Sequence, residues 1–153
     1  MTKIIKTGDS LFAVGWGATE KVKRGKKGKK LSKDIKQVEI PFSHDKNCTD
    51  KVQEMLDEDK KKYQYWYFNN TTQFCAADPS GQNDTCSGDS GGPAMVFHRN
   101  PDDGNMISWY QVGIVSWGYG CAQKGEYGYY TKVSAFFKWL DTYIKTWNGP
   151  GRI

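Results

Sequence analysis

The sequence predicts an all-β protein, an antiparallel barrel capped by a C-terminal helix. The 153-residue chain contains 17 glycines and is 14% aromatic, a composition that suits a compact, turn-rich β protein. Its apolar segments are short and separated by turn residues, and a long helical periodicity begins only after residue 132. No internal repeat or domain boundary interrupts this order, so we expect a single unit.

Two strands are expected near the start of the chain. Leu11–Trp16 is apolar and closed by glycine, which indicates a strand that runs into a turn. Lys36–Ile40 alternates polar and apolar residues up to Pro41, which indicates a short strand. Between them, seven of the ten residues of Lys21–Lys30 are basic, so we expect an exposed loop and consider it the candidate site for a polyanion such as heparin.

A helix and four further strands are expected between residues 45 and 132. Asp45–Lys60 carries Val52, Met55 and Leu56 at helical spacing among polar residues, which indicates a short surface helix. The strands are expected at Gln73–Ala76, Ala94–His98, Trp109–Trp117 and Tyr127–Lys132. Asn100–Gly104 has the composition of a turn and would join the second and third of these.

The chain is expected to end in an amphipathic helix with Ser134 as its N-cap. The apolar residues recur at intervals of three and four: Val133, Phe136, Phe137, Leu140, Ile144 and Trp147. Glycine and proline after Asn148 end the pattern, which leaves 148–153 as a tail.

The four cysteines are Cys48, Cys75, Cys86 and Cys121, and no pair has Cys-x-x-Cys spacing. Because the chain has only two histidines, two disulfides are favoured over a zinc site, and we expect no metal or cofactor. Disulfides imply an oxidising compartment, so we expect a secreted protein although the chain shows no signal peptide. No segment is apolar enough to span a membrane.

The segment Asp84-Thr-Cys-Ser-Gly-Asp-Ser-Gly-Gly-Pro93 is the candidate for chemistry. Glycine at position 88 allows backbone N–H groups to converge on one point without a side chain in the way. Two such groups form an oxyanion hole, and Ser90 at their focus would be a nucleophile. Without further context, a glycine-rich loop of this kind is more often only a tight turn.

This segment resembles the active-site segment of the chymotrypsin/trypsin family of serine proteases, and further motifs follow in the family's order. These are Val14-Gly-Trp-Gly17, Phe74-Cys-Ala, Gly113-Ile-Val-Ser-Trp-Gly118 followed by Cys121, Tyr127-Gly-Tyr-Tyr-Thr-Lys-Val133, and the terminal helix with Trp139-Leu140. The resemblance covers about residues 10–147. It implies that residues 1–153 are the C-terminal half of a trypsin-like peptidase domain, a six-stranded antiparallel Greek-key barrel with a C-terminal helix.

The resemblance also implies roles for individual residues. Ser90 matches the nucleophile, and the backbone N–H groups of Gly88 and Ser90 match the oxyanion hole. Asp84 matches the acid at the base of the specificity pocket, which selects Arg or Lys before the scissile bond. Asp89 matches the carboxylate that pairs with a freed N-terminal amine in active members of the family.

The substrate-binding residues and the disulfides follow in the same way. Ser116, Trp117 and Gly118 match the strand that pairs with the substrate backbone, and Gly118 and Gly128 match the walls of the pocket. The implied disulfides are Cys48–Cys75 and Cys86–Cys121. The long basic loop and the polar segment Asn100–Asn105 are similar to features of secreted cascade proteases of the clotting or complement type.

The histidine and aspartate of the catalytic triad are not expected in this chain, because the family carries them in the first barrel. His44 and His98 lack the family's sequence context, so we interpret both as ordinary surface residues. The activation site is missing as well, and Asp89 is therefore expected to lack its usual partner.

Three hypotheses remain open from the sequence. The chain is part of a secreted trypsin-like endopeptidase and inactive alone, or a non-catalytic relative that binds partners, or one half of a two-chain protease whose other half carries the histidine and aspartate. The first is favoured, because a pure binder has no need of Asp84, Ser90 and two pocket glycines together.

Overall fold

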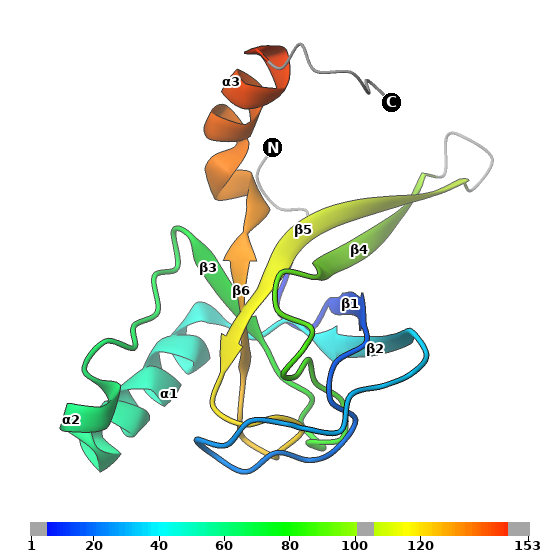
Figure 1. Cartoon of the computed structure of the whole chain (residues 1–153). Coiled ribbons are helices and arrows are strands. Elements are labelled where there is room, and N and C mark those ends of the chain that lie inside the picture. Colours follow the sequence, from blue (N-terminus) through cyan, green and yellow to red (C-terminus); the bar gives the residue numbers. More distant parts are fainter. Residues whose placement is uncertain (1–5, 101–105, 147–153) are drawn as a thin grey trace.

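The computed structural model describes residues 6–100 and 106–146 (Figure 1). Its strands are β1 (Ser10–Gly15), β2 (Lys36–Pro41), β3 (Gln73–Ala76), β4 (Pro93–Asn100), β5 (Met106–Gly118) and β6 (Gly128–Lys132). Its helices are α1 (Asp45–Glu58), α2 (Lys60–Tyr63), the 3₁₀-helix η2 (Val133–Phe136) and α3 (Phe137–Thr146). The expected strands all form, whereas the short helix α2 was not expected from the sequence.

The six strands form one antiparallel sheet that curls into a barrel. The order in the sheet is β2-β1-β4-β5-β6-β3. Its two edges meet where Phe42 forms a bridge with Ala76 and the Ser43 N–H donates to the Cys75 carbonyl at 3.0 Å. The consecutive strands β4, β5 and β6 lie side by side, and β3, which precedes them in the chain, lies beside β6, which is the Greek-key order. The predicted six-stranded antiparallel barrel is therefore confirmed.

The core lies inside the barrel and follows the period of two that strands impose on their side chains. Leu11 and Ala13 are both buried on β1, two residues apart. The members of the cluster are Leu11, Ile40, Phe42, Phe74, Ala76, Ala94, Val96, Val115 and Tyr130. Phe74 lies between two other rings, with centroids 4.8 Å from Phe42 and 5.1 Å from Tyr130.

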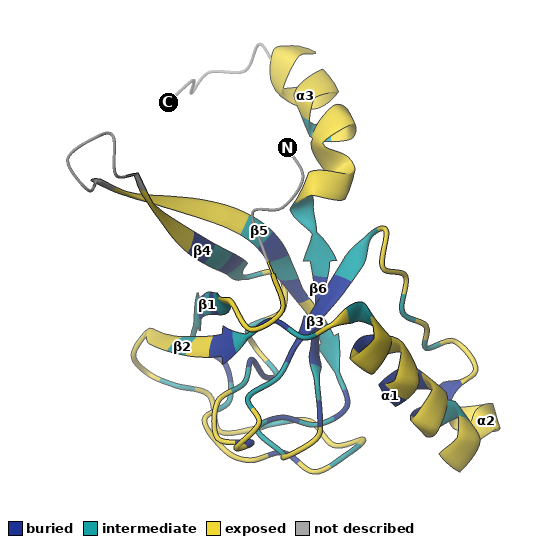
Figure 2. Ribbon diagram, turned by 180° about the vertical axis from the view of Figure 1, so that it is seen from behind, coloured by how far each residue is buried: buried dark blue, intermediate teal, exposed yellow. Residues whose placement is uncertain are grey.

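Helix α1 packs one face against the outside of the barrel. It begins after His44, whose imidazole Nδ1 accepts a hydrogen bond from the Lys46 N–H at 3.1 Å and caps the helix. Cys48, Val52 and Met55 are buried at spacings of four and three residues, while the opposite face is exposed (Figure 2). The disulfide between Cys48 and Cys75 fixes this helix to β3.

The C-terminal helix forms, but it does not cap the barrel. Figures 1 and 2 show α3 extending away from the sheet, and no residue of η2 or α3 is buried. Its apolar residues lie in solvent, with Phe137 50% and Ile144 69% exposed. The side chains of the strands already fill the barrel, so no described residue buries the apolar face of α3. Ser134 lies inside η2 and does not act as the expected N-cap, and Trp147 falls outside the described residues.

The hairpin of β4 and β5 is longer than the sequence predicts. Both strands continue past the barrel to Asn100 and Met106, and residues 101–104 of the expected turn fall outside the described residues. This extension also exposes apolar side chains, among them Phe97, Ile107, Trp109 and Tyr110. None of the helices in the described ranges combines the length and the hydropathy that crossing a membrane requires.

We expect α3 to be unstable in the isolated chain. A ten-residue helix without buried contacts is marginal in water, because nucleation is costly and no packing offsets it. Hydrogen–deuterium exchange should show the amides of Phe137–Thr146 exchanging at least about 100-fold faster than those of β5 and β6. Equal protection of α3 and these strands would contradict this expectation.

Candidate functional site

The serine loop, Cys86–Gly92, folds back onto the barrel at the end of β5. The Gly91 N–H donates to the Val115 carbonyl and the Val115 N–H donates to the Gly92 carbonyl, both at 2.9 Å. Gly88 and Gly91 have φ values of +102° and +83°, a region that favours glycine. Ser90 lies exposed at the turn between them. The loop thus presents one hydroxyl to solvent on a backbone that is fixed on both sides.

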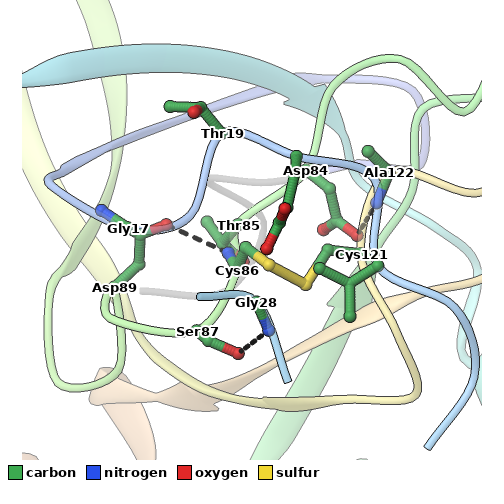
Figure 3. Close-up of a disulfide and its surroundings, with 12 residues drawn as sticks. Gly17, Thr19, Gly28, Asp84, Thr85, Cys86, Ser87, Asp89, Cys121 and Ala122 are labelled. Carbon is green, nitrogen blue, oxygen red and sulfur yellow. Dashed lines mark hydrogen bonds between the residues drawn. A yellow bond between two sulfur atoms is a disulfide. The ribbon is translucent and has the colours of Figure 1, made fainter. Parts of the chain in front are cut away.

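The Asp89 carboxylate points inward and has two hydrogen-bond donors. The Gly17 N–H donates to Oδ1 at 2.8 Å and the Cys86 N–H donates to Oδ2 at 3.0 Å (Figure 3). A Cβ atom at Gly15 or Gly17 would overlap this carboxylate. Backbone N–H groups of the serine loop and of the turn after β1 thus compensate the Asp89 carboxylate in place of the amine that is its usual partner in the family.

A cavity of about 260 Å³ opens beside Asp89. It is lined by β1, by the first residues of β2 and by the segment that leads into the serine loop. Asp84 and Ala122 also reach it. Both acids singled out from the sequence thus border one hollow in the barrel wall.

The disulfide between Cys86 and Cys121 joins the serine loop to the segment beyond β5 (Figure 3). We call residues Cys121–Tyr127 the edge segment. Within it, the Ala122 N–H donates to Asp84 Oδ2 at 2.9 Å. The Asp84 side chain is thus hydrogen-bonded to the residue that follows Cys121 (Figure 3). This disulfide and Cys48–Cys75 are the two pairs that the family resemblance implies.

The second oxygen of Asp84, Oδ1, is buried and has no hydrogen-bond partner among the described residues. It faces Gly128, where a Cβ atom would lie 3.1 Å from it. Next to it, the hydroxyls of Thr85 and Tyr130 are hydrogen-bonded to each other at 3.0 Å. Burial raises the pKa of Asp84 to about 7, although the hydrogen bond from Ala122 acts in the opposite direction. A cation placed against the free oxygen would stabilise the ionised form of such a buried acid.

The last residues of β5 have one free strand edge. Strand β4 pairs with β5 only as far as Ile114, opposite Pro93, while β6 pairs with the other side up to Gly118. No strand pairs with Ser116–Gly118 on the β4 side in the described part of the chain. A register shift at Ser116 leaves this residue exposed, and the Trp117 ring stacks on Tyr129 at 3.6 Å. A peptide could add here as a further strand.

The basic loop, Lys21–Lys30, is exposed at its lysines but anchored at three other residues. Val22 is buried and exchanges hydrogen bonds of 3.0 and 2.9 Å with Cys121. Arg24 forms ion pairs with carboxylates, and the Gly28 N–H donates to the Ser87 hydroxyl at 3.1 Å. This loop is therefore packed on the Cys86–Cys121 disulfide, which its composition alone did not indicate.

Neither histidine is placed as a base for Ser90. His44 caps α1, and His98 is an exposed residue of β4 opposite Ser108. No hydrogen bond joins either imidazole to Ser90 in the described ranges.

Sequence reasoning missed several residues that shape the site. Gly15 was not singled out as the space for Asp89, nor Ala122 as the donor to Asp84. Ala122 has a φ of 52°, which no sequence pattern announces for an alanine. The only available signal was its position next to a cysteine and within four residues of Gly125.

Comparison with known proteins agrees with these features. A protein-family model described as Trypsin matches residues 2–140. Vitamin K-dependent protein C from Rattus norvegicus is 31% identical over 143 residues, and the protein of the same name from Mus musculus is 29% identical. The alignments cover 93% of this chain but 26% of each relative. The chain thus spans about a quarter of the length of these curated relatives.

We expect the charge on Asp84 to destabilise the fold at neutral pH. Between its ordinary pKa of 3.8 and its folded-state pKa near 7, the folded protein holds a proton that the unfolded chain has released, so stability falls as pH rises. The free energy of unfolding of the Asp84→Asn variant, measured relative to wild type, should therefore increase by about 1–3 kcal/mol from pH 5 to pH 8.

Urea unfolding at the two pH values measures this gain. Asp50→Asn, an equal change at an exposed residue of α1, is the control and should show no such growth with pH. A gain for Asp84→Asn that is the same at pH 5 and pH 8 would contradict the raised pKa.

Proposed function

Because this chain belongs to the trypsin family of serine proteases, we propose that it supplies the nucleophile, the oxyanion hole and the specificity pocket of a secreted serine endopeptidase. Residues 1–153 would form the C-terminal half of the peptidase domain. The observation that carries the proposal is the position of Ser90. The loop that holds it is hydrogen-bonded to Val115, immediately before the free strand edge at Ser116–Gly118.

In the proposed reaction, Ser90 Oγ attacks the carbonyl carbon of the scissile bond. The negative charge that develops on the carbonyl oxygen is stabilised by the N–H groups of Gly88 and Ser90. The positive φ of Gly88 supports this role, because it turns the backbone in a way that few other residues allow. The hydroxyl proton goes to a histidine, which must come from outside this chain.

The substrate is proposed to be a protein segment that adds to β5 along Ser116, Trp117 and Gly118. Its side chain before the scissile bond would pass along Gly118 and Gly128, which are paired across β5 and β6, and end at Asp84. The free Oδ1 of Asp84 supports Arg or Lys in this position, since a cation would satisfy a buried oxygen that lacks a partner. An apolar side chain would leave that oxygen unsatisfied.

Asp89 is proposed to receive a freed N-terminal amine of the complete protease. The cavity beside it supports this assignment, because it offers space next to a carboxylate that two N–H groups already hold in place. An ammonium group there would add the positive charge that these neutral donors lack.

The missing partner is proposed to be the first barrel of the same peptidase domain, with the catalytic histidine and aspartate. The uncovered apolar residues of α3 and of the β4–β5 hairpin support such a partner, since a large exposed apolar patch marks an interaction surface. A non-catalytic binding protein and a two-chain protease are the alternatives, and both would use the same surface. The exposed lysines of the basic loop make a polyanion a second proposed ligand.

The isolated chain should not react at Ser90, because a serine without a base remains a neutral alcohol. A fluorophosphonate probe should leave residues 1–153 unlabelled, whereas addition of the first-barrel half of a protein C relative should restore labelling. Ser90→Ala should abolish it. Stoichiometric labelling of the chain alone would show that a base lies within it, and no labelling with the partner present would favour the non-catalytic alternative.

The reconstituted enzyme should prefer Arg over Phe before the scissile bond by about 100-fold or more in kcat/KM. The reason is that the Asp84 carboxylate rewards a buried cation and penalises an apolar group. Matched ester substrates measure the ratio, and Asp84→Ser should abolish the preference. A preference for Phe in the unaltered protein would overturn the assignment of Asp84.

A further inference from the structure

A chain of ion pairs connects the basic loop, α1 and the edge segment. Glu126 Oε1 lies 2.5 Å from Arg24 Nε and 3.3 Å from Lys51 Nζ. The two remaining guanidinium nitrogens of Arg24 contact Glu54 at 3.0 Å and Glu58 at 2.5 Å on α1. All three nitrogens of one arginine are thus engaged, and they join three segments that are far apart in the sequence.

Glu126 is the buried centre of this network. Its side chain is 5% exposed, and its second oxygen, Oε2, has no partner among the described residues. Burial of a carboxylate costs free energy unless cations compensate for the lost hydration. Arg24 is the closer of the two cations and the one with the hydrogen bond, so the position of Glu126 depends mainly on Arg24.

The segment that Glu126 belongs to forms part of the proposed pocket. Ala122 donates the hydrogen bond to Asp84, and Gly128, two residues after Glu126, faces the free oxygen of Asp84. The backbone of this segment is not relaxed, since Ala122 has a φ of 52°. A non-glycine residue keeps such a conformation only when its surroundings enforce it.

The edge segment is held in place by contacts at both of its ends. At its start, Cys121 is held by the disulfide and by Val22, and the Gln123 side chain donates to the Val22 carbonyl. At its far end, next to Gly128, the side-chain anchor is Glu126. The basic loop therefore contacts both ends, through Val22 and through Arg24.

We propose that Arg24 and Glu126 are positioning residues of the specificity pocket, which hold the edge segment so that Ala122 and Gly128 keep their places around Asp84. This inference rests on the proposed role of Asp84 as the pocket floor. It assigns to one residue of the basic loop a part in substrate recognition that the loop's lysines do not share.

The test is the affinity of the chain for benzamidine, a planar amidinium that mimics the arginine side chain. Arg24→Gln should weaken binding about tenfold, because small displacements of positioning groups have large effects. Lys23→Gln is the matched control. It removes the same charge from the same loop, but Lys23 is exposed and forms no ion pair within residues 6–100 and 106–146, so affinity should change less than twofold. Arg24→Lys keeps the charge, and its affinity for benzamidine should lie between those of the Arg24→Gln and Lys23→Gln variants.

Two conditions separate positioning from stability and from titration. Binding is measured at about 15 °C, with thermal unfolding of each variant recorded, so that all variants are folded during the assay. It is measured at pH 8.5, above the pKa of about 7 of Asp84. In addition, Arg24→Gln should cause no further loss in a chain that already carries Glu126→Gln, because the two residues act as one pair.

The outcomes are distinct. Equal weakening by the Arg24 and Lys23 variants, or no weakening by Arg24→Gln, would overturn the positioning role while the peptidase proposal stands. Failure of the unaltered chain to bind benzamidine would remove the pocket and this inference with it. A third outcome combines weaker benzamidine binding by Arg24→Gln with no labelling of Ser90 even when the partner is present. That outcome would support the positioning role and overturn the peptidase proposal.

Discussion

The Cys86–Cys121 disulfide is the cross-link on which the candidate site depends. On one side of it, the Cys86 N–H holds Asp89 inward. On the other side, Cys121 pairs with Val22 and directs the next residue, Ala122, at Asp84. The bond closes 35 residues, which corresponds to roughly 3–4 kcal/mol in the chain-entropy model. The serine loop and the edge segment therefore have a fixed relative position that the backbone of neither segment would give alone.

Three carboxylates lie in or beside this region, and each is compensated in a different way. Asp89 accepts from two backbone N–H groups, and Glu126 faces two cations. Asp84 receives a single N–H from Ala122 and keeps one oxygen without a partner. Glu126 also keeps one buried oxygen without a partner, but two cations already face it, whereas no ion pair of the described residues involves Asp84. Asp84 is therefore the one of the three that is suited to an outside cation. That contrast favours a binding role for Asp84 over a purely structural one.

The barrel was predictable because its signals are local. Short apolar segments between glycines mark β1 and β5, and the spacing of Val52 and Met55 marks α1. The glycines of the serine loop predicted a tight turn, whereas the role of Ser90 came from the family resemblance. The Arg24–Glu126 pair was not, since 102 residues separate its members and a charge run looks the same whether it is solvated or anchored. Likewise, the periodicity of α3 shows that the helix has an apolar face but does not reveal what covers that face.

The exposed apolar face of α3 helps to decide between a peptidase and a non-catalytic binding protein. The barrel core is complete without α3, so the exposed side chains of Phe137, Trp139 and Ile144 are not needed for the fold of the described residues. Ser90 shows a second deficit, since neither histidine of the chain is hydrogen-bonded to it. A non-catalytic binder would account for the apolar face but not for an exposed serine between two positive-φ glycines. A first barrel that brings a histidine and an aspartate would account for both deficits with one interface, which is why the peptidase proposal is preferred.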